Sequence, residues 1–315
     1  MVTYIKKILT PELFLAVFNH RHPWSKGALP DGATVGPYHF KPSNEYMQTF
    51  YDLTFHQALL PLSKIPLAEL LDYDFTQLLP PPTASDYPQQ ALGLITILDQ
   101  QRGLCSGYGF RYTRSFFDPI CEKLARQLTA LPADVRPDGK HAWLSRGWTF
   151  DEWIVNVVWF WAPLVHADAF MTQDRQHLKD HLHFMRAEVE AHTGQTDPFA
   201  SLEASDDVDI HAFERIESEG PPKRGYFTPG PATCCDYAFW WIRILNSHFA
   251  ITDMCGHYPY WIRWKGLLFS EADKEFLRQT RFRYDPDDEP VLQQVREDYL
   301  EGVWRDLPVN DEYER

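Results

Sequence analysis

The chain has 315 residues, of which 44% are hydrophobic and 15% aromatic, so it can bury a substantial core as one large domain or two small ones. Its net charge of -14 disfavours binding to the phosphate backbone of nucleic acids. The most apolar run, residues 153–165, is interrupted by Asn156 and Pro163 and is too short to span a bilayer. The first ten residues lack the apolar stretch of a signal peptide, so we expect a cytoplasmic protein without a membrane segment.

Helix starts recur through the first half of the chain, whereas the alternation typical of strands is sparse. Thr10 followed by Pro11 indicates a first short helix, because Pro is favoured at the first helical position. Residues 20–42 are rich in Gly, Pro and His and are expected to form a long loop. Three further helices are expected at residues 43 to about 60, from Asp86 through 98, and at 111–131.

The second half of the chain gives stronger start signals. Thr149 and Glu152 match a capping box, in which each side chain satisfies the other residue's free N–H group. Thr172 is expected to cap the next helix, which runs through His192, and residues 194–232 are expected to be loop-rich. Further helices are predicted at 235 to about 254, after Ser270, and at 289–303. The prediction is one all-α domain over residues 1–315, with acidic stretches on its surface at 206–209 and in the C-terminal tail.

Cysteine and glycine patterns argue against disulfides and cofactors. The five cysteines are odd in number and widely spaced, and the pair Cys234 and Cys235 lacks the two-residue gap of zinc sites, so we expect buried free thiols. Cys105 as a nucleophile would need a base close by. There is no phosphate-binding glycine loop, since Gly103 and Gly107 are dispersed and follow no strand. We therefore expect no nucleotide, nicotinamide or flavin cofactor.

Three segments carry a resemblance to a known family. They are residues 94–103 with the aromatic–Asp motif at 116–118, residues 160–168, and residues 248–277. In order and spacing, over roughly residues 85–280, they resemble the bacterial and fungal family called domain of unknown function 924. The resemblance implies an all-helical, tetratricopeptide-like stack of antiparallel helix pairs, with this chain as a divergent fungal-type member. It implies no activity, because that family has no established one.

The chain differs from that family around one proline. Where the family has Arg, His, Arg and Asn, this chain has His257, Tyr260, Trp261 and Ile262. Guanidinium groups suit carboxylate and phosphate, so their loss points away from an anionic ligand, and the added rings point to a flat apolar or aromatic one. The alternative is that these rings only fill the core. The residues expected to bind substrate are Tyr258, Tyr260, Trp261, Trp161 and Trp241.

A set of titratable residues comes from the same three segments. A buried Asp can orient a nearby imidazole, and His is the side chain best suited to proton transfer near neutral pH. The alternative is that Asp99 and Arg102 form a helix-terminal tether and that His166 is a core residue. The candidate catalytic residues are Asp99, Arg102, His166, Asp168, His248 and His257.

A second group of histidines is a weaker candidate. His177 and His181 are four residues apart, the spacing at which two imidazoles on one helix can hold a metal. His183 and His192 lie on the same expected helix, but Glu188 is nearly two turns away, so the ligand set is incomplete. We expect a polar solvated face and no metal.

Together these patterns predict a cofactor-free enzyme whose partner is a small-molecule substrate, largely apolar or aromatic; they leave the oligomeric state open. Cyclisation, rearrangement, dehydration or isomerisation, for example in natural-product biosynthesis, needs only a shaped aromatic pocket and a few acid–base groups. The alternative function is a non-catalytic helical module that binds a peptide or protein. Aromatic residues that line a closed pocket would favour the enzyme, and exposed rings in an open groove would favour the binding module.

Overall fold

The computed structural model describes residues 2–100, 107–281 and 288–307. These residues form an all-α single domain, as predicted, around a large hydrophobic core whose members range from Ile5 to Leu307. A second, small cluster consists of Trp264, Leu292 and Val295. Within the described part of the chain there is no β-strand, and one isolated bridge joins Arg224 to Pro231. None of the helices described is both long and apolar enough to cross a bilayer.

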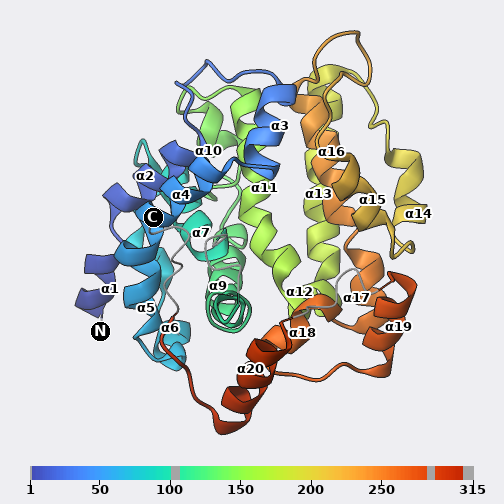
Figure 1. The fold of residues 1–315 in the computed structure, drawn as a ribbon. Coiled ribbons are helices and arrows are strands. Elements are labelled where there is room, and N and C mark those ends of the chain that lie inside the picture. The colour runs from blue at the N-terminus through green and yellow to red at the C-terminus, as the bar shows by residue number, and fades with distance from the viewer. Residues whose placement is uncertain (1, 101–106, 282–287, 308–315) are drawn as a thin grey trace.

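The ten helices described in the first half lie mostly on the left and at the top of Figure 1. A π-helical turn at Phe55–Leu59 joins α4 to α5, and another at Thr113–Phe117 joins α8 to α9. The helices are α1 (Val2–Ile8), α2 (Pro11–Arg21), α3 (Gly32–Phe40), α4 (Asn44–Thr54), α5 (Leu60–Ser63), α6 (Leu67–Asp72), α7 (Tyr87–Asp99), α8 (Gly109–Tyr112), α9 (Asp118–Thr129) and α10 (Lys140–Leu144).

The second half supplies the central helices and those at the right and bottom of Figure 1. The predicted caps at Thr149 and Ser270 are confirmed, each as a complete capping box. The helices are α11 (Phe150–His166), α12 (Asp168–Gln173), α13 (Arg175–Thr193), α14 (Glu203–Asp206), α15 (Ala212–Glu219), α16 (Cys234–Asn246), α17 (Phe249–Cys255), α18 (Pro259–Ile262), α19 (Glu271–Gln279) and α20 (Glu289–Glu301).

Both segments predicted as loops contain helices. In the segment 20–42, the Asp31 side chain accepts a hydrogen bond from the Thr34 N–H at 2.9 Å and caps α3. The close approach of α3 to α16 requires Gly32, where a Cβ would lie 2.0 Å from the Thr233 carbonyl oxygen. In the segment 194–232, α15 buries Ala212 and Ile216, one helical turn apart. Helix formation is stabilised in both segments by burial against α16, which a local pattern does not reveal.

Other differences concern helix ends and one acidic stretch. Thr172 does not cap the long helix, because it lies inside α12 and α13 begins after Asp174. The predicted helix 235–254 is two helices, since Ser247 and His248 turn their side chains back to the Ile244 carbonyl oxygen, at 2.7 and 2.8 Å. Asp206 is buried among arginines and is not a solvated surface residue.

Helix α11 is the axis of the domain. It packs against α7 and α9 on one side and against α16 on another, and it is buried from Trp153 to Val165 (Figure 1). Helix α7 in turn packs closely on α2, because at Gly93 a Cβ would lie 2.0 Å from the Phe14 carbonyl oxygen. The C-terminal half of α11 therefore lies where the two sides of the domain meet.

Candidate functional site

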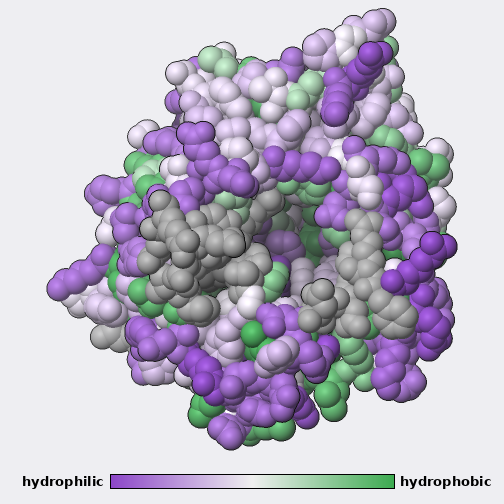
Figure 2. All heavy atoms as spheres, viewed as in Figure 1, coloured by the Kyte–Doolittle hydropathy of each residue, from purple (hydrophilic) through white to green (hydrophobic). Residues whose placement is uncertain are grey.

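A cavity of about 380 Å³ opens beside the C-terminal half of α11. Figure 2 shows a hollow near the middle of this face of the molecule. Its apolar walls are Phe40, Trp159, Ala162, Val165, Phe213, Trp241, Ile244 and Leu245. Its polar lining residues are Lys41, Asp99, Gln100, Thr113, Arg114, His166, Glu217 and His248.

Asp99 and His166 form a hydrogen-bonded pair at one end of this cavity. Asp99 is the last residue of α7 and His166 the last of α11, and the His166 Nδ1–H donates to Asp99 Oδ1 at 2.8 Å. The Gln100 side-chain amide donates to the other carboxylate oxygen. Burial acts to raise the pKa of Asp99, but the interaction with His166, the hydrogen bond from Gln100 and the charge of Arg114 outweigh burial, so the pKa lies below its ordinary value. The ionised carboxylate therefore fixes the orientation and tautomer of the imidazole.

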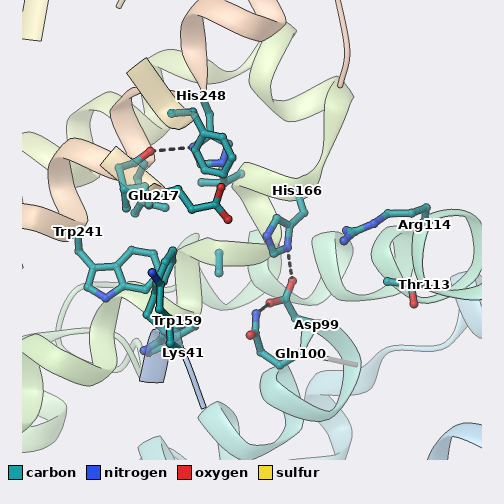
Figure 3. Close-up of a pocket in the computed structure, with 16 residues that line it drawn as sticks. Lys41, Asp99, Gln100, Thr113, Arg114, Trp159, His166, Glu217, Trp241 and His248 are labelled. Atoms are coloured by element: carbon teal, nitrogen blue, oxygen red, sulfur yellow. Dashed lines mark hydrogen bonds and ion pairs between the residues drawn. The ribbon is translucent and has the colours of Figure 1, made fainter. Parts of the chain in front are cut away.

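The free nitrogen of His166 is available to a ligand. In Figure 3 the ring nitrogen that is not bonded to Asp99 points toward the middle of the cavity. With Nδ1 donating to Asp99, Nε2 carries the lone pair that can accept a proton. The imidazole is about one quarter exposed, whereas the Asp99 carboxylate is almost fully buried. This arrangement can act as a general base and return the proton as a general acid.

Arg114 lies on the side of His166 away from the aromatic walls (Figure 3). It comes from the π-helical turn before α9, a type of irregularity that is frequent at functional sites. Its guanidinium bonds Asp118 at 2.9 Å and lies 3.6 Å from the ring centroid of Trp261. Its charge also helps to lower the pKa of Asp99.

His248 lines the cavity as a neutral imidazole. Its Nδ1–H donates to the Ile244 carbonyl oxygen at 2.8 Å, which leaves Nε2 as an acceptor. Burial lowers the pKa of His248 to about 4. Its ring packs against Phe213 and, edge to face, against Tyr258. His248 therefore offers a hydrogen-bond acceptor at neutral pH and carries no charge there.

The opposite wall carries the carboxylate of Glu217, which is not among the residues predicted from the sequence. Glu217 and Phe213 are four residues apart on α15 and share the face toward the cavity. In Figure 3 the Glu217 carboxylate points into the space between His248 and His166. Among the described residues its carboxylate has no hydrogen-bond or ion-pair partner. Lys41, after α3, adds a cation at the rim, and both residues lie in segments predicted as loops.

The remaining catalytic candidates do not line the cavity. Asp168 accepts a hydrogen bond from the Tyr258 backbone N–H at 3.0 Å and pairs with Lys265, so it fastens the segment before α18. His257 pairs with Asp273 at 2.8 Å, and Asp273 is part of the capping box of α19. Arg102 lies outside the described residues. The structure thus brings Asp99, His166 and His248 together at one cavity and gives Asp168 and His257 tethering contacts.

The aromatic residues predicted to bind substrate do not all line the cavity either. Trp241 lines the cavity, with its ring 4.7 Å from that of Trp159, centroid to centroid. Trp261 is not among the residues that line the cavity, and its ring centroid lies 5.7 Å from that of His166. Tyr258 is buried against Trp261, and Tyr260 packs beside the same ring.

Trp161 is a correction to the predicted binding set. Its Nε1–H donates to a carboxylate oxygen of Asp138 at 3.0 Å, and the residue is buried in the core. It lies on α11 with Trp159, but two residues of helix place the two rings about 200° apart around the axis. Only Trp159 can therefore face the cavity.

The second histidine group is engaged in structural contacts. His181 is buried, its Nδ1–H donates to the His177 carbonyl oxygen at 2.8 Å, and Nε2 accepts from Arg136 at 2.9 Å. Burial lowers the pKa of His181 to about 4. Glu188, the proposed third ligand, pairs with Lys140. In the part of the chain that the structure describes, no three His, Cys, Asp or Glu side chains are arranged to hold a metal ion.

The described cysteines are free thiols. Burial raises the pKa of Cys235 and of Cys255 to about 12, so neither is a thiolate nucleophile at neutral pH. Cys121 is fully buried, and burial raises its pKa well above the ordinary value. Cys105 lies outside the described residues.

Comparison with known proteins adds no assignment, because no family model, curated protein or solved structure matches this chain. The candidate site therefore rests on its own geometry.

Proposed function

We propose that this protein is a cofactor-free enzyme that converts a small, largely apolar or aromatic molecule by general acid–base catalysis. The observation that carries the proposal is the Asp99–His166 pair, whose free imidazole nitrogen points into the cavity (Figure 3). A positioned imidazole of this kind contributes about 10²–10⁴-fold to a proton-transfer step. Asp99 acts through His166 and is a positioning residue.

The walls of the cavity indicate the kind of substrate. Trp159, Trp241 and Phe40 offer flat apolar surface, and a cavity of about 380 Å³ lies in the range that holds small organic ligands. Lys41 and Glu217 give the rim one charge of each sign, so the lining does not select a strongly charged molecule. His248 can accept a hydrogen bond from a substrate hydroxyl or amide.

Glu217 is the second proton-transfer group in this proposal. It faces His166 across the cavity, so one group can remove a proton while the other delivers one (Figure 3). Such a transfer needs no oxidant or reductant. Isomerisation and dehydration follow this scheme directly, and cyclisation or rearrangement can be started by the same protonation. A cytoplasmic step of natural-product biosynthesis is one concrete form of the proposal.

The family resemblance is part of the same proposal. The three segments that carry it come together: the Asp99–His166 bond joins the first to the second, and the bond from the Tyr258 N–H to Asp168 joins the second to the third. These contacts and the all-helical fold support a distant relation to the family called domain of unknown function 924. The tetratricopeptide-like stacking of helix pairs belongs to that proposal.

A second candidate function has one observation in its favour. Helix α20 and the residues near it expose a set of large apolar side chains, which can mark a protein-binding surface. They are Leu267, Leu268, Tyr299, Leu300, Val303 and Trp304. Trp159 and Trp241, by contrast, are buried residues in the wall of a cavity, which favours the enzyme.

The enzyme proposal is tested by incubating the purified protein with a metabolite extract in D₂O and comparing mass spectra with those from His166→Asn. We expect at least one product, or one deuterium-labelled metabolite, that forms with the wild type and not with the variant. His257→Asn is the matched control, because it removes an imidazole that is paired with Asp273 away from the cavity. Equal conversion by the wild type and His166→Asn would overturn the proposal.

A further inference from the structure

A second cavity, of about 340 Å³, lies at the other end of α11. It is lined by the first residues of α11 and α16, the C-terminal end of α13, and a loop that the bridge from Arg224 to Pro231 closes. No residue that lines it also lines the first cavity. Asp151 and His166 lie near opposite ends of α11, roughly 22 Å apart along the axis at 1.5 Å per residue.

Asp151 supplies a carboxylate that makes few contacts within the fold. The capping box of α11 is made by Thr149 and Glu152, so Asp151 is not needed there. The Cys235 thiol approaches its carboxylate at 3.9 Å, but a thiol is only a weak donor. Burial raises the pKa of Asp151, and the nearby His192 and the Cys235 thiol offset this effect only in part.

Asp236, in the same cavity, provides the contrast. Its two carboxylate oxygens accept from the Tyr226 backbone N–H at 3.1 Å and from the Thr233 N–H and hydroxyl at 2.8 Å each. Asp236 is therefore committed to capping α16 and to holding the loop of residues 224–231. Asp151 is the carboxylate that can take a ligand.

Aromatic rings form the apolar side of this cavity. Phe239 is fully buried in its wall, whereas Phe227, on the loop, is 39% exposed at its mouth. Their ring centroids are 6.2 Å apart at 73°, so the two rings form a corner in which Phe227 is the exposed side. The loop that carries Phe227 is fixed by the Tyr226 bond to Asp236 and by a bond from Gly225 N–H to the Gly230 carbonyl oxygen.

The charge of the lining selects the sign of the ligand. Among the described lining residues, Asp151 and Asp236 are carboxylates, His192 is the one basic group, and none is a lysine or arginine. Helix N-termini often bind anions, but the caps of α11 and α16 already take N–H groups of their first turns. A carboxylate beside aromatic rings is instead the combination that recognises an organic ammonium group.

We infer that this second cavity binds a small aromatic amine as its ammonium cation, with the ammonium group on the Asp151 carboxylate and the ring in the corner of Phe227 and Phe239. The site is independent of the proposed acid–base function. It could serve a substrate or a regulator of the same chemistry, because the cavity defines the ligand class and not its use.

The test is titration calorimetry of the full-length protein with 2-phenylethylamine, with the neutral isostere 2-phenylethanol as the matched ligand. We expect the alcohol to bind the wild type at least about tenfold more weakly than the amine does, since one charge-assisted hydrogen bond is lost. For the same reason the amine should bind Asp151→Asn at least about tenfold more weakly than it binds the wild type. Glu12→Gln makes the same change of charge at an exposed position on α2 and should leave the affinity unchanged. Phe227→Ala, at an exposed position, should weaken the amine about threefold to tenfold.

Three results would overturn the inference. The amine and the alcohol could bind equally, or Asp151→Asn could behave as Glu12→Gln does. Loss of amine affinity in His166→Asn would place the amine in the first cavity. Melting temperatures of the same variants separate a folding defect from a binding defect, and Phe227→Ala keeps the test open if Asp151→Asn does not fold.

Discussion

The two walls of the first cavity differ in how they are built. One is formed by the ends of α7 and α11, where Asp99 and His166 meet through a hydrogen bond. The other is formed by the end of α3 and by α15, which contribute Phe40, Lys41 and Glu217. The first wall consists of long buried helices, and the second of short helices in segments rich in Gly, Pro and acidic residues.

This difference separates fixed chemistry from adjustable surroundings. On the first wall, Asp99 is held by two side chains and His166 by one, so their geometry is determined by the protein. On the second wall, Lys41 and Glu217 have no side-chain partner among the described residues, so they can adjust to a ligand. A proton-transfer group gains from fixed orientation, whereas groups that contact varied substrate substituents gain from freedom.

The largest expected effect compares one residue from each wall. His166→Asn should lower kcat for the converted metabolite by about 10²–10⁴-fold, because it removes the positioned imidazole. Glu217→Gln should lower it by about ten- to a hundredfold, because the amide still donates a hydrogen bond but cannot exchange a proton. Steady-state kinetics of the two variants checks this order. A larger loss for Glu217→Gln would assign the base to the second wall.

The next comparison is between two tryptophans from neighbouring helices. Trp161→Ala should lower the free energy of unfolding by about 3–5 kcal/mol, because it opens a hole in the core and removes one of the donors to Asp138, which keeps its ion pair with Arg136. Trp241→Ala should cost less stability and weaken ligand binding more, since its ring lines an existing cavity. Urea unfolding and ligand affinity, measured on both variants, test this. The reverse pattern would show that Trp161 reaches the ligand.

The sequence predicts the helical class and points to two residues of the first wall. Helix starts such as Thr149 and Ser270 are local, because a cap involves residues three positions apart. Asp99 and His166 are titratable residues in two of the segments on which the expected family resemblance depends. Their direct contact follows from packing, which residue spacing does not encode.

The second wall could not be read from the sequence for the same physical reason. Helix α15 has eight residues and α3 contains Pro37, so neither has a strong intrinsic preference for helix. Each is stabilised by packing on α16. Glu217 is one of several acidic residues in this part of the chain, and only its position opposite His166 distinguishes it from the others (Figure 3). The face shared by Phe213 and Glu217, four residues apart, was the one local signal for this wall.

The pH dependence of stability tests the burial of His248, which lies where the two walls meet. Burial lowers its pKa to about 4 in the folded protein, against 6.5 in the unfolded chain. Between these values the unfolded state binds a proton that the folded state does not. The stabilisation is therefore complete above pH 6.5 and is lost as the pH falls toward 4, by an amount on the order of 3 kcal/mol.

His248→Gln should remove this contribution, so that unfolding takes up as much as one proton fewer between pH 7 and pH 5. The free energy of unfolding should then fall less steeply over this pH range. His22 and His181, whose pKa values burial also lowers to about 4, keep their share of the slope in the variant. Chemical unfolding at both pH values measures the difference. An unchanged pH dependence in His248→Gln would show that this imidazole is reached by water and is free to take up its proton.

The smallest expected effect is on stability, and it compares Thr149, which caps α11, with Thr172, which was predicted to cap the next helix but does not. Thr149 accepts a hydrogen bond from the Glu152 N–H at 3.2 Å, and its own N–H donates to the Glu152 carboxylate at 2.7 Å. Thr149→Ala should therefore lower the free energy of unfolding by about 1 kcal/mol. Thr172 instead donates its hydroxyl to the Asp168 carbonyl oxygen within α12, at an exposed position. Thr172→Ala should stay within about 0.5 kcal/mol of the wild type, because substitutions at exposed positions that hold no cap usually change stability by no more than this. Urea unfolding resolves the two values, and an equal cost at both positions would show that α13 begins at Thr172 in solution.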